Sequence, residues 1–324
     1  MRLREHLDGI WLMAMALLSL FAATFYFVSQ IRSTTLNAAY TVLVLLQVVA
    51  LTMYLWGPEK LTFGPLRALY RLLYASSVVV IPVFASILVC LVNQYHAAIP
   101  DAIDATSMPV EQILPTDKTV VYNTSTAYVI FPEHTKIALA CEERPSESDE
   151  SITWCSGAAF QHAVEIGFSQ ENIEGDHAVD GTLYTSPHSH DGFAAFTFAN
   201  GSYSFEFDDP RRAIREAAEA GGSGFMQYAL MRDGQAVMRF DRPRPRCYRA
   251  LAELNGSVCI IDSVNVLRPN EFLAELRRLG VRNALYMDMG PGWNYSWFRN
   301  ASNQVVTLFG IQVPWSHNWV IFRK

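Results

Sequence analysis

The stretch NALYMDMGPGWNYSW, residues 283–297, runs from an apolar strand pattern through an acidic residue into a turn and three aromatic residues. Asp288 falls at the carboxyl end of the predicted strand, where side chains emerge into loops that often carry function. Gly290 and Gly292 permit a close approach of the backbone to a ligand, and Pro291 stiffens the bend. The stretch therefore fits either a tight turn whose aromatic residues fill a core or the floor of a site for a sugar.

The aromatic residues after this turn alternate in sequence as Trp293, Tyr295 and Trp297. If the chain is extended here, they share one face and can stack on a sugar ring. We therefore expect Trp293, Asn294 and Tyr295 to contact the substrate. The alternative is that Asp288 caps the turn and the aromatic residues belong to the core.

The composition of the 324-residue chain excludes one class of partner and indicates more than one region. Hydrophobic residues make up 51% and charged residues 17%, and the apolar excess is concentrated near the N-terminus. The net charge of -6, without a basic cluster, leaves no electrostatic footprint for nucleic acid, so we expect no nucleic-acid partner. We also expect no cofactor, and the oligomeric state stays open.

Three uncharged apolar runs, residues 10–28, 38–56 and 72–92, are each long enough to cross a hydrocarbon core of about 30 Å as a helix. They predict a transmembrane three-helix anchor over residues 1–95, although a cleaved signal peptide is an alternative for the first run. The Lys and Arg residues that flank the runs predict a cytoplasmic N-terminus. The sequence thus predicts an integral membrane protein that contacts the lipid bilayer and carries an extracytoplasmic C-terminal domain.

The rest of the chain divides into a short connector and a strand-rich domain. Residues 96–117 mix prolines, acids and short apolar stretches, which predicts a linker rather than a packed element. Over residues 118–324, short apolar segments alternate with Gly, Asn, Asp and Pro, as in strands joined by turns.

Two helices stand out among these strands. Residues 208–222 (DDPRRAIREAAEAGG) have Asp209 as a candidate N-cap, followed by a proline at the first helical position. Residues 269–281 (PNEFLAELRRLGV) have Asn270 as a candidate N-cap and an apolar stripe. Residues 157–167 are a candidate third helix. Strands mixed with a few helices, without regular βαβ alternation, predict an α+β domain with a mixed sheet.

A second stretch, FTFANGSYSFEF at residues 196–207, places Asn200 and Gly201 after an apolar strand and Tyr203 just beyond them. Asn-Gly between two strands ordinarily marks a two-residue hairpin turn. Its position along the chain suggests another meaning. An arginine and an alanine follow at 249–250, and NALYMDMG comes after a further helix.

This order of segments resembles the phosphodiester glycosidase family, whose members typically show NGGFF-like, RTA-like and NLDGGGS-like segments. The counterparts here are residues 200–203, 249–250 and 283–290, and they are especially similar to a bacterial, membrane-anchored branch. The resemblance covers roughly residues 118–324. Residues 289–292 replace the triple glycine of the pattern, and no residue separates the arginine from the alanine.

The resemblance implies a hydrolase of sugar-1-phosphodiester linkages in an envelope glycan or a related substrate. Such a reaction needs a carboxylate that stabilises positive charge on the sugar or activates water, and a group that holds the phosphate. The resemblance assigns the first role to Asp288 and the second to Arg249, whose guanidinium matches two phosphate oxygens. Glu253 becomes the second carboxylate, because residues four apart on a strand point to the same side. Asn200 and Tyr203 are assigned to substrate binding.

Histidines add further candidates. His177 beside Asp176 can move a proton near neutral pH and is assigned to the substrate site. His188, His190 and Asp191 have donor atoms for a metal, but a loop cluster of this kind is more often polar surface, so we expect no metal.

An alternative to this function stays open. A non-catalytic glycan-binding or envelope-assembly module on the same fold would use the aromatic residues after the turn.

The four cysteines after the apolar runs also allow two interpretations. Cys141 with Cys155 and Cys247 with Cys259 are the disulfide pairs closest in sequence, and four free buried thiols fit equally well.

Overall fold

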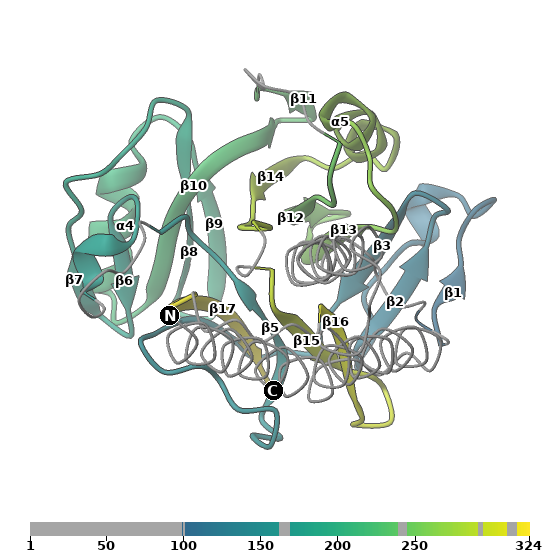
Figure 1. Ribbon diagram of the computed structural model, residues 1–324, viewed down its shortest axis with the longest axis horizontal. Helices are drawn as coiled ribbons and strands as arrows, with labels where there is room; N and C mark the ends of the chain where they lie inside the picture. The colour runs from purple at the N-terminus through teal and green to yellow at the C-terminus, as the bar shows by residue number, and fades with distance from the viewer. Residues whose placement is uncertain (1–98, 100, 162–168, 239–244, 291–293, 310–315) are drawn as a thin grey trace, which may run out of the picture. The chain divides into compact units, whose positions relative to one another are not determined.

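The computed structural model describes residues 99, 101–161, 169–238, 245–290, 294–309 and 316–324, which are coloured in Figure 1. The chain divides into two compact units, residues 1–92 and 93–324, and every described residue belongs to the second. The three predicted transmembrane segments therefore lie outside the described residues. Seventeen strands, two α-helices and two short 3₁₀-helices make up the described part.

Twelve of these strands form the larger sheet. They are β1 (Ile103–Asp104), β2 (Val120–Asn123), β3 (Ala127–Phe131), β6 (His177–Val179), β7 (Thr182–Tyr184), β8 (Phe193–Ala199), β9 (Ser202–Glu206), β10 (Ser223–Arg232), β11 (Gln235–Ala236), β12 (Arg249–Leu254), β13 (Ser257–Ser263) and β14 (Asn283–Tyr286). The hydrogen-bonded order is β1-β2-β3-β13-β12-β14-β10-β6-β7; β8 and β11 also pair with β10, and β9 pairs with β8. Among the described strands, only β1 and β2 run parallel to each other.

Strand β10 joins two regions of this sheet and is the long curved strand in Figure 1. Its first part pairs with β8 from Ser223 to Tyr228, and its second part pairs with β14 at Ala229 and Met231. The register shifts between Ala229 and Met231, an irregularity of the kind that lets a strand bend. The change of partner brings the end of β14 next to the β6–β8 region.

The remaining five strands form a second sheet in the order β16-β15-β5-β17-β4. They are β4 (Lys136–Cys141), β5 (Ile152–Gly157), β15 (Ser296–Arg299), β16 (Val305–Phe309) and β17 (Asn318–Arg323). Strand β4 contacts β6, β8 and β10 of the larger sheet. The two sheets therefore bury apolar side chains between them, as packed sheets do.

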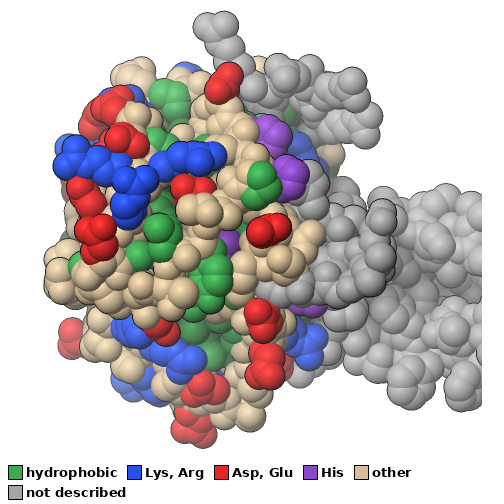
Figure 2. All heavy atoms as spheres, turned by 90° about the vertical axis from the view of Figure 1, so that its left-hand side faces the viewer, with side chains coloured by type: hydrophobic (Ala, Val, Ile, Leu, Met, Phe, Trp, Pro, Cys, Tyr) green, Lys and Arg blue, Asp and Glu red, His purple; other side chains and the backbone are tan. Residues whose placement is uncertain are grey.

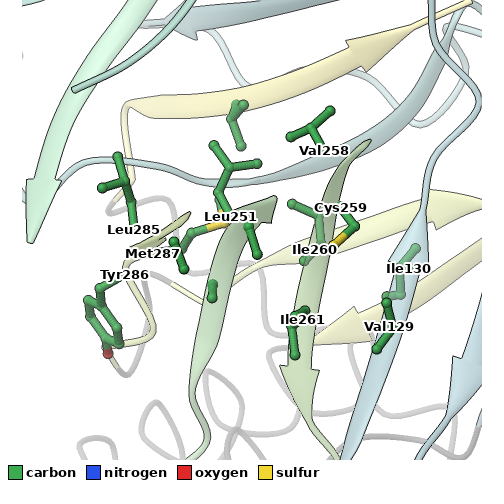
Figure 3. Close-up of a cluster of buried hydrophobic side chains, with 14 of the residues drawn as sticks. Val129, Ile130, Leu251, Val258, Cys259, Ile260, Ile261, Leu285, Tyr286 and Met287 are labelled. Atoms are coloured by element: carbon green, nitrogen blue, oxygen red, sulfur yellow. The ribbon is translucent and has the colours of Figure 1, made fainter. Parts of the chain in front are cut away.

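Much of the core lies around β3, β12, β13 and β14 (Figure 3). Ile130, Leu251, Ile260 and Leu285, one from each strand, are completely buried. Strands covered on both faces read as continuous apolar runs, which is why these segments are apolar without strict alternation. In β13 even Cys259 is completely buried, and the four described cysteines are free thiols, so the disulfide alternative is not realised.

Helix α4 (Pro210–Glu219) confirms its predicted start. Asp209 is the N-cap, and its carboxylate accepts a hydrogen bond from the Arg212 N–H at 3.2 Å. Ile214 and Ala217 lie on its buried face, and the helix packs on β8 and β10.

Helix α5 (Pro269–Arg278) begins earlier than its predicted cap allows. Its N-cap is Arg268 rather than Asn270, and the Glu271 carboxylate accepts a hydrogen bond from the Arg268 N–H at 2.7 Å. Pro269 takes the first helical position, where a missing N–H costs nothing. Phe272 and the leucines of the predicted stripe are buried.

The predicted α+β class is wrong. Strands dominate the described residues, and the helical elements there are α4, α5 and the 3₁₀-helices η1 (Val110–Gln112) and η2 (Gln170–Asn172). Of the candidate third helix, residue 157 ends β5, residues 158–161 are not helical, and the rest lies outside the described residues. Ala158 and Ala159 are buried in the core, so tertiary packing overrides the helix propensity of alanine here.

The prediction of an integral membrane protein with an extracytoplasmic domain does not stand. Within the part of the chain that the structure describes, no helix is both long and apolar enough to cross a bilayer. The apolar runs on which that prediction depended lie outside this part of the chain.

Part of the segment predicted as a linker, residues 96–117, packs into the domain. Ile99, Ala105 and Ile113 are buried, and β1 pairs with β2. These side chains belong to the core rather than to an open connector. The predicted boundaries at 95 and 118 stay predictions.

Candidate functional site

Asp288 lies two residues beyond the end of β14, where backbone hydrogen bonds hold the chain. The Met287 N–H donates to the Arg249 carbonyl at 3.0 Å, and the Asp288 N–H donates to the Ala158 carbonyl at 3.2 Å. The carboxylate accepts a hydrogen bond from the Gly290 N–H at 2.9 Å, so Asp288 does cap the turn. The residue is only 8% exposed, which fixes an acid in a nearly closed environment.

Burial raises the pKa of Asp288 from 3.8 to about 7. The hydrogen bond from Gly290 and the positive charge of Arg246 lower this pKa, whereas the negative charge of Glu174 raises it further. A carboxyl group with a pKa near neutrality can both accept and return a proton at working pH. Such perturbed acids cluster at functional sites.

The positive charge beside Asp288 belongs to Arg246. Its guanidinium carbon lies 5.4 Å from the ring centroid of Tyr248 and 5.9 Å from that of Tyr286. Burial alone would lower the pKa of Arg246, but its interactions with Tyr286, Tyr248 and Asp288 raise it, so the side chain is always charged. A half-buried guanidinium of this kind suits the binding of a phosphate group.

Tyr286 contributes a hydroxyl group without a partner. The residue is 2% exposed, and within the described residues its Oη has no hydrogen-bond partner. Figure 3 shows its ring at the edge of the labelled group, with the hydroxyl directed away from the other labelled side chains. Burial raises the pKa of Tyr286, so the hydroxyl stays protonated and can donate. A buried, unpaired hydroxyl near Asp288 is a place where an oxygen of a ligand can bind.

Glu174 and His190 bring a second acid and a base to Asp288. His190 Nε2 lies 3.0 Å from Glu174 Oε2. The Glu174 side chain is 13% exposed and that of His190 47% exposed, and histidine side chains reach the surface on the face shown in Figure 2. The charge of Glu174 raises the pKa of Asp288, so Glu174 interacts both with His190 and with Asp288.

Arg249, predicted to hold the phosphate, is instead part of the core. Its Nε and Nη2 donate to the two carboxylate oxygens of Asp262 at 2.6 and 2.8 Å, and Nη2 also donates to Ser296 Oγ at 2.7 Å. The guanidinium lies 5.3 Å from the Trp154 ring and 5.6 Å from the Phe309 ring. Its side chain is completely buried and its charge is already paired, so the predicted phosphate role is corrected to a structural one.

Glu253 does not reach Asp288, although β12 is a strand as predicted. The register of β12 with β14 places Glu253 opposite Asn283. Asp288 lies five positions (288 minus 283) further along, which is roughly 17 Å at about 3.3 Å per residue. The Asn283 side chain donates to the Glu253 carboxylate at 2.7 Å, and Arg282 approaches it to 3.8 Å. Glu253 is therefore corrected from a second carboxylate of the site to a partner at the far end of the strand.

Asn200 and Gly201 form the two-residue turn between β8 and β9. Their φ angles are +51° and +74°, as a type I′ turn requires, so the hairpin interpretation is confirmed. The Tyr203 hydroxyl donates to a backbone carbonyl of the β12–β13 turn at 2.9 Å. Seven positions of β8 (200 minus 193), or roughly 23 Å, separate Asn200 from Phe193, whose ring packs on His190. The structure does not bring Asn200 or Tyr203 to Asp288.

The aromatic residues after the turn belong to the core. Trp297 is completely buried, Tyr295 is 3% exposed and Asn294 is 2% exposed. The Tyr295 hydroxyl donates to the Glu147 carboxylate at 2.7 Å. The core alternative is thus correct for Tyr295 and Trp297, which offer no face to a sugar; Trp293 lies outside the described residues.

His177 is a structural histidine. It is completely buried, its Nε2 is 2.9 Å from the Gln170 side-chain oxygen, and its ring stacks on Tyr184 at 5.1 Å. Burial lowers the pKa of His177 to about 4, so the ring is neutral at physiological pH. The role expected for it in proton transfer is corrected accordingly.

The sequence analysis identified Asp288 but not Arg246, Glu174 or Tyr286. A weak signal for Arg246 exists in the run PRPRCYRA, where two arginines stand three positions apart. In an extended chain an odd spacing places two side chains on opposite faces, so Arg246 and Arg249 cannot point the same way. Which of the two faces Asp288 depends on strand register, which local pattern does not give.

No family model matches the chain, and no curated protein matches it. Among solved structures, it is similar to the catalytic domain of zebrafish N-acetylglucosamine-1-phosphodiester alpha-N-acetylglucosaminidase, auto-inhibited by its pro-peptide, with 10% sequence identity and a TM-score of 0.44. That similarity covers 61% of this chain and 76% of the zebrafish chain. A hypothetical protein from Synechocystis is similar at 12% identity and a TM-score of 0.38, over 65% of this chain and 64% of that one. Both similarities are distant.

Proposed function

We propose that the described domain is a hydrolase that cleaves the glycosidic bond of a sugar phosphodiester. The observation that carries the proposal is Asp288, a nearly buried acid with a pKa of about 7 beside the Arg246 guanidinium. The unpaired hydroxyl of Tyr286 completes a set of groups suited to an anionic ligand. The substrate class comes from the resemblance of residues 283–290 to the phosphodiester glycosidase pattern.

Each group has a role in this reaction. Arg246 binds two phosphate oxygens, and Tyr286 donates a hydrogen bond to the substrate. Ionised Asp288 takes a proton from a water molecule, whose oxygen attacks the anomeric carbon as in an inverting glycosidase. The bond from that carbon to the phosphate oxygen breaks, and its electron pair stays on the phosphate.

A non-catalytic glycan-binding module has less support. Such a module needs exposed aromatic surface, and Tyr295 and Trp297 are buried. The half-buried Arg246 guanidinium, in contrast, suits an anionic phosphodiester better than a neutral sugar.

Hydrolysis of a chromogenic sugar phosphodiester tests the proposal. Because Asp288 acts as a base, kcat/KM is expected to rise with pH as Asp288 ionises near pH 7. Asp288→Asn is expected to lose roughly 100-fold or more of this activity, the usual effect of removing a general base. Glu253→Gln is the matched control, since the strand register places that acid far from Asp288. An inactive wild-type protein, or an Asp288→Asn variant with full activity and the same pH profile, would refute the proposal.

A further inference from the structure

Glu174 and His190 have the geometry of a proton-transfer dyad. The His190 ring is held by two aromatic contacts, stacked on Tyr228 at 5.9 Å and edge-on to Phe193 at 5.3 Å. Its Nε2 faces the Glu174 carboxylate at 3.0 Å, so Nδ1 is the nitrogen left to exchange a proton. With the His190 side chain 47% exposed, that nitrogen can meet a substrate.

The same short segment anchors both acids. The Glu174 N–H donates to the Phe160 carbonyl at 2.8 Å, and the Asp288 N–H donates to the Ala158 carbonyl at 3.2 Å. Two residues of chain span at most about 7 Å, so these carbonyls are neighbours. The backbone therefore holds Glu174 near Asp288, and the negative charge of Glu174 acts on that acid.

Glu174 also has the properties of a positioning group. It is 13% exposed, and its carboxylate meets His190 Nε2 directly. A carboxylate in this position sets the orientation of an imidazole ring, as in other acid–histidine pairs. The arrangement leaves a ring of fixed orientation with one nitrogen available.

We propose that His190 is a second proton-transfer residue of this site and that Glu174 positions it. The inference rests on the proposed function. While Asp288 takes a proton from the attacking water, protonated His190 gives its Nδ1 proton to the phosphate oxygen that departs with the electron pair of the broken bond. Exchange of one proton at each residue with solvent restores the starting state. The second pKa of a phosphate monoester is about 6, and imidazole is the side-chain group that exchanges protons in this range.

Hydrolysis of the chromogenic sugar phosphodiester by His190→Ala tests the dyad. We expect kcat to fall roughly 100-fold, at the low end for loss of an acid–base group because phosphate is already a good leaving group. KM is expected to change little, and added imidazole is expected to restore part of kcat. His188→Ala is the matched control, because His188 is an exposed histidine two positions earlier on the same loop.

Glu174→Gln tests the positioning role. Glutamine keeps the shape of the side chain and removes its charge, so kcat is expected to fall while KM stays near the wild-type value. The limb of the pH profile that belongs to Asp288 is expected to move to lower pH, because the charge of Glu174 raises that pKa. A purely structural residue would leave this limb in place.

The outcomes separate the dyad from the function on which it rests. If the wild-type protein is active and His190→Ala retains its kcat, or loses it without recovery in imidazole, the dyad is overturned and the proposed function stands. If Glu174→Gln keeps the wild-type kcat, the positioning role is overturned. An inactive wild-type protein overturns both.

Discussion

Two arginine–aspartate arrangements in this domain use the same residue types differently. Arg249 and Asp262 are completely buried and joined by two hydrogen bonds. Arg246 acts on Asp288 through its charge, and that carboxylate accepts a hydrogen bond from a backbone N–H and keeps a pKa near 7. The first pair is a direct, two-bond ion pair inside the core, although within the described residues Arg249 Nη1 has no hydrogen-bond partner; the second leaves an acid that can still exchange a proton. Residue type alone therefore does not define a site; what differs is that the Asp262 carboxylate is bonded directly to its arginine, whereas the Asp288 carboxylate is bonded to a backbone N–H and keeps a raised pKa.

Breaking the buried Arg249–Asp262 ion pair is expected to give the largest effect on stability. Asp262→Ala leaves Arg249 buried without its carboxylate, which should lower the free energy of unfolding by about 5 kcal/mol, the upper end for such pairs. Urea denaturation measures this loss. The double variant Arg249→Met with Asp262→Leu removes both charges and is expected to recover much of it. A single variant as stable as the wild-type protein would erase the contrast between the two arrangements.

Removing the charge of Asp288 should raise the free energy of unfolding at high pH and leave it unchanged at low pH. Because the folded-state pKa of Asp288 is raised from 3.8 to about 7, its contribution to stability is fully present below pH 4 and is lost as pH rises through 7. Each pKa unit corresponds to about 1.36 kcal/mol, so ionisation of Asp288 in the folded state lowers the free energy of unfolding by on the order of 4 kcal/mol. Asp288→Asn should thus match the wild-type protein at pH 4 and exceed its free energy of unfolding at pH 8. Equal differences at both pH values in urea denaturation would contradict the raised pKa.

Substitution of Arg246 is expected to lower activity with little effect on stability. Arg246→Ala is expected to lower kcat/KM for the sugar phosphodiester about 100-fold, equivalent to about 2.7 kcal/mol of transition-state binding. Its free energy of unfolding should stay within about 0.5 kcal/mol of the wild-type value, because the side chain is only half-buried. Arg282→Ala, at an arginine whose side chain is 66% exposed, is the control and should keep full activity. A large loss of stability in Arg246→Ala would make this arginine structural as well.

The smallest effect is expected at the hairpin turn. Asn200 has a φ of +51°, a conformation that costs alanine about 1 kcal/mol. Asn200→Ala should lower the free energy of unfolding by about that amount and leave hydrolysis unchanged. A loss of activity without a loss of stability would return Asn200 to the substrate.

The sequence predicted those parts of the fold that are determined by residues close together in the chain. The cap at Asp209, the type I′ turn at Asn200 and the strands β12 and β14 all follow from short stretches. The fold class was missed because the segment near 157, which contains helix-forming alanines, is decided by packing with distant strands. Propensity alone does not contain that information.

The site was predicted only in part for the same reason. Asp288 follows from the end of one strand, but its neighbours come from three other segments, at Glu174, His190 and Arg246. Arg249 lies in the stronger motif, but its guanidinium is paired with Asp262 in the core. Strand register, which sets the face of each side chain, decides between them.

Strand β10 connects the part of the larger sheet that contains β8 with the part that contains β14, so the two parts are expected to open together. Its backbone bonds to β8 up to Tyr228 and to β14 from Ala229, and α4 packs on its outer end. Opening the strand near Tyr228 breaks hydrogen bonds on both sides of that point, so amide hydrogens from 224 to 231 should exchange with deuterium as one cooperative unit. A ligand held beside Asp288 would then slow exchange as far away as the hairpin of β8 and β9.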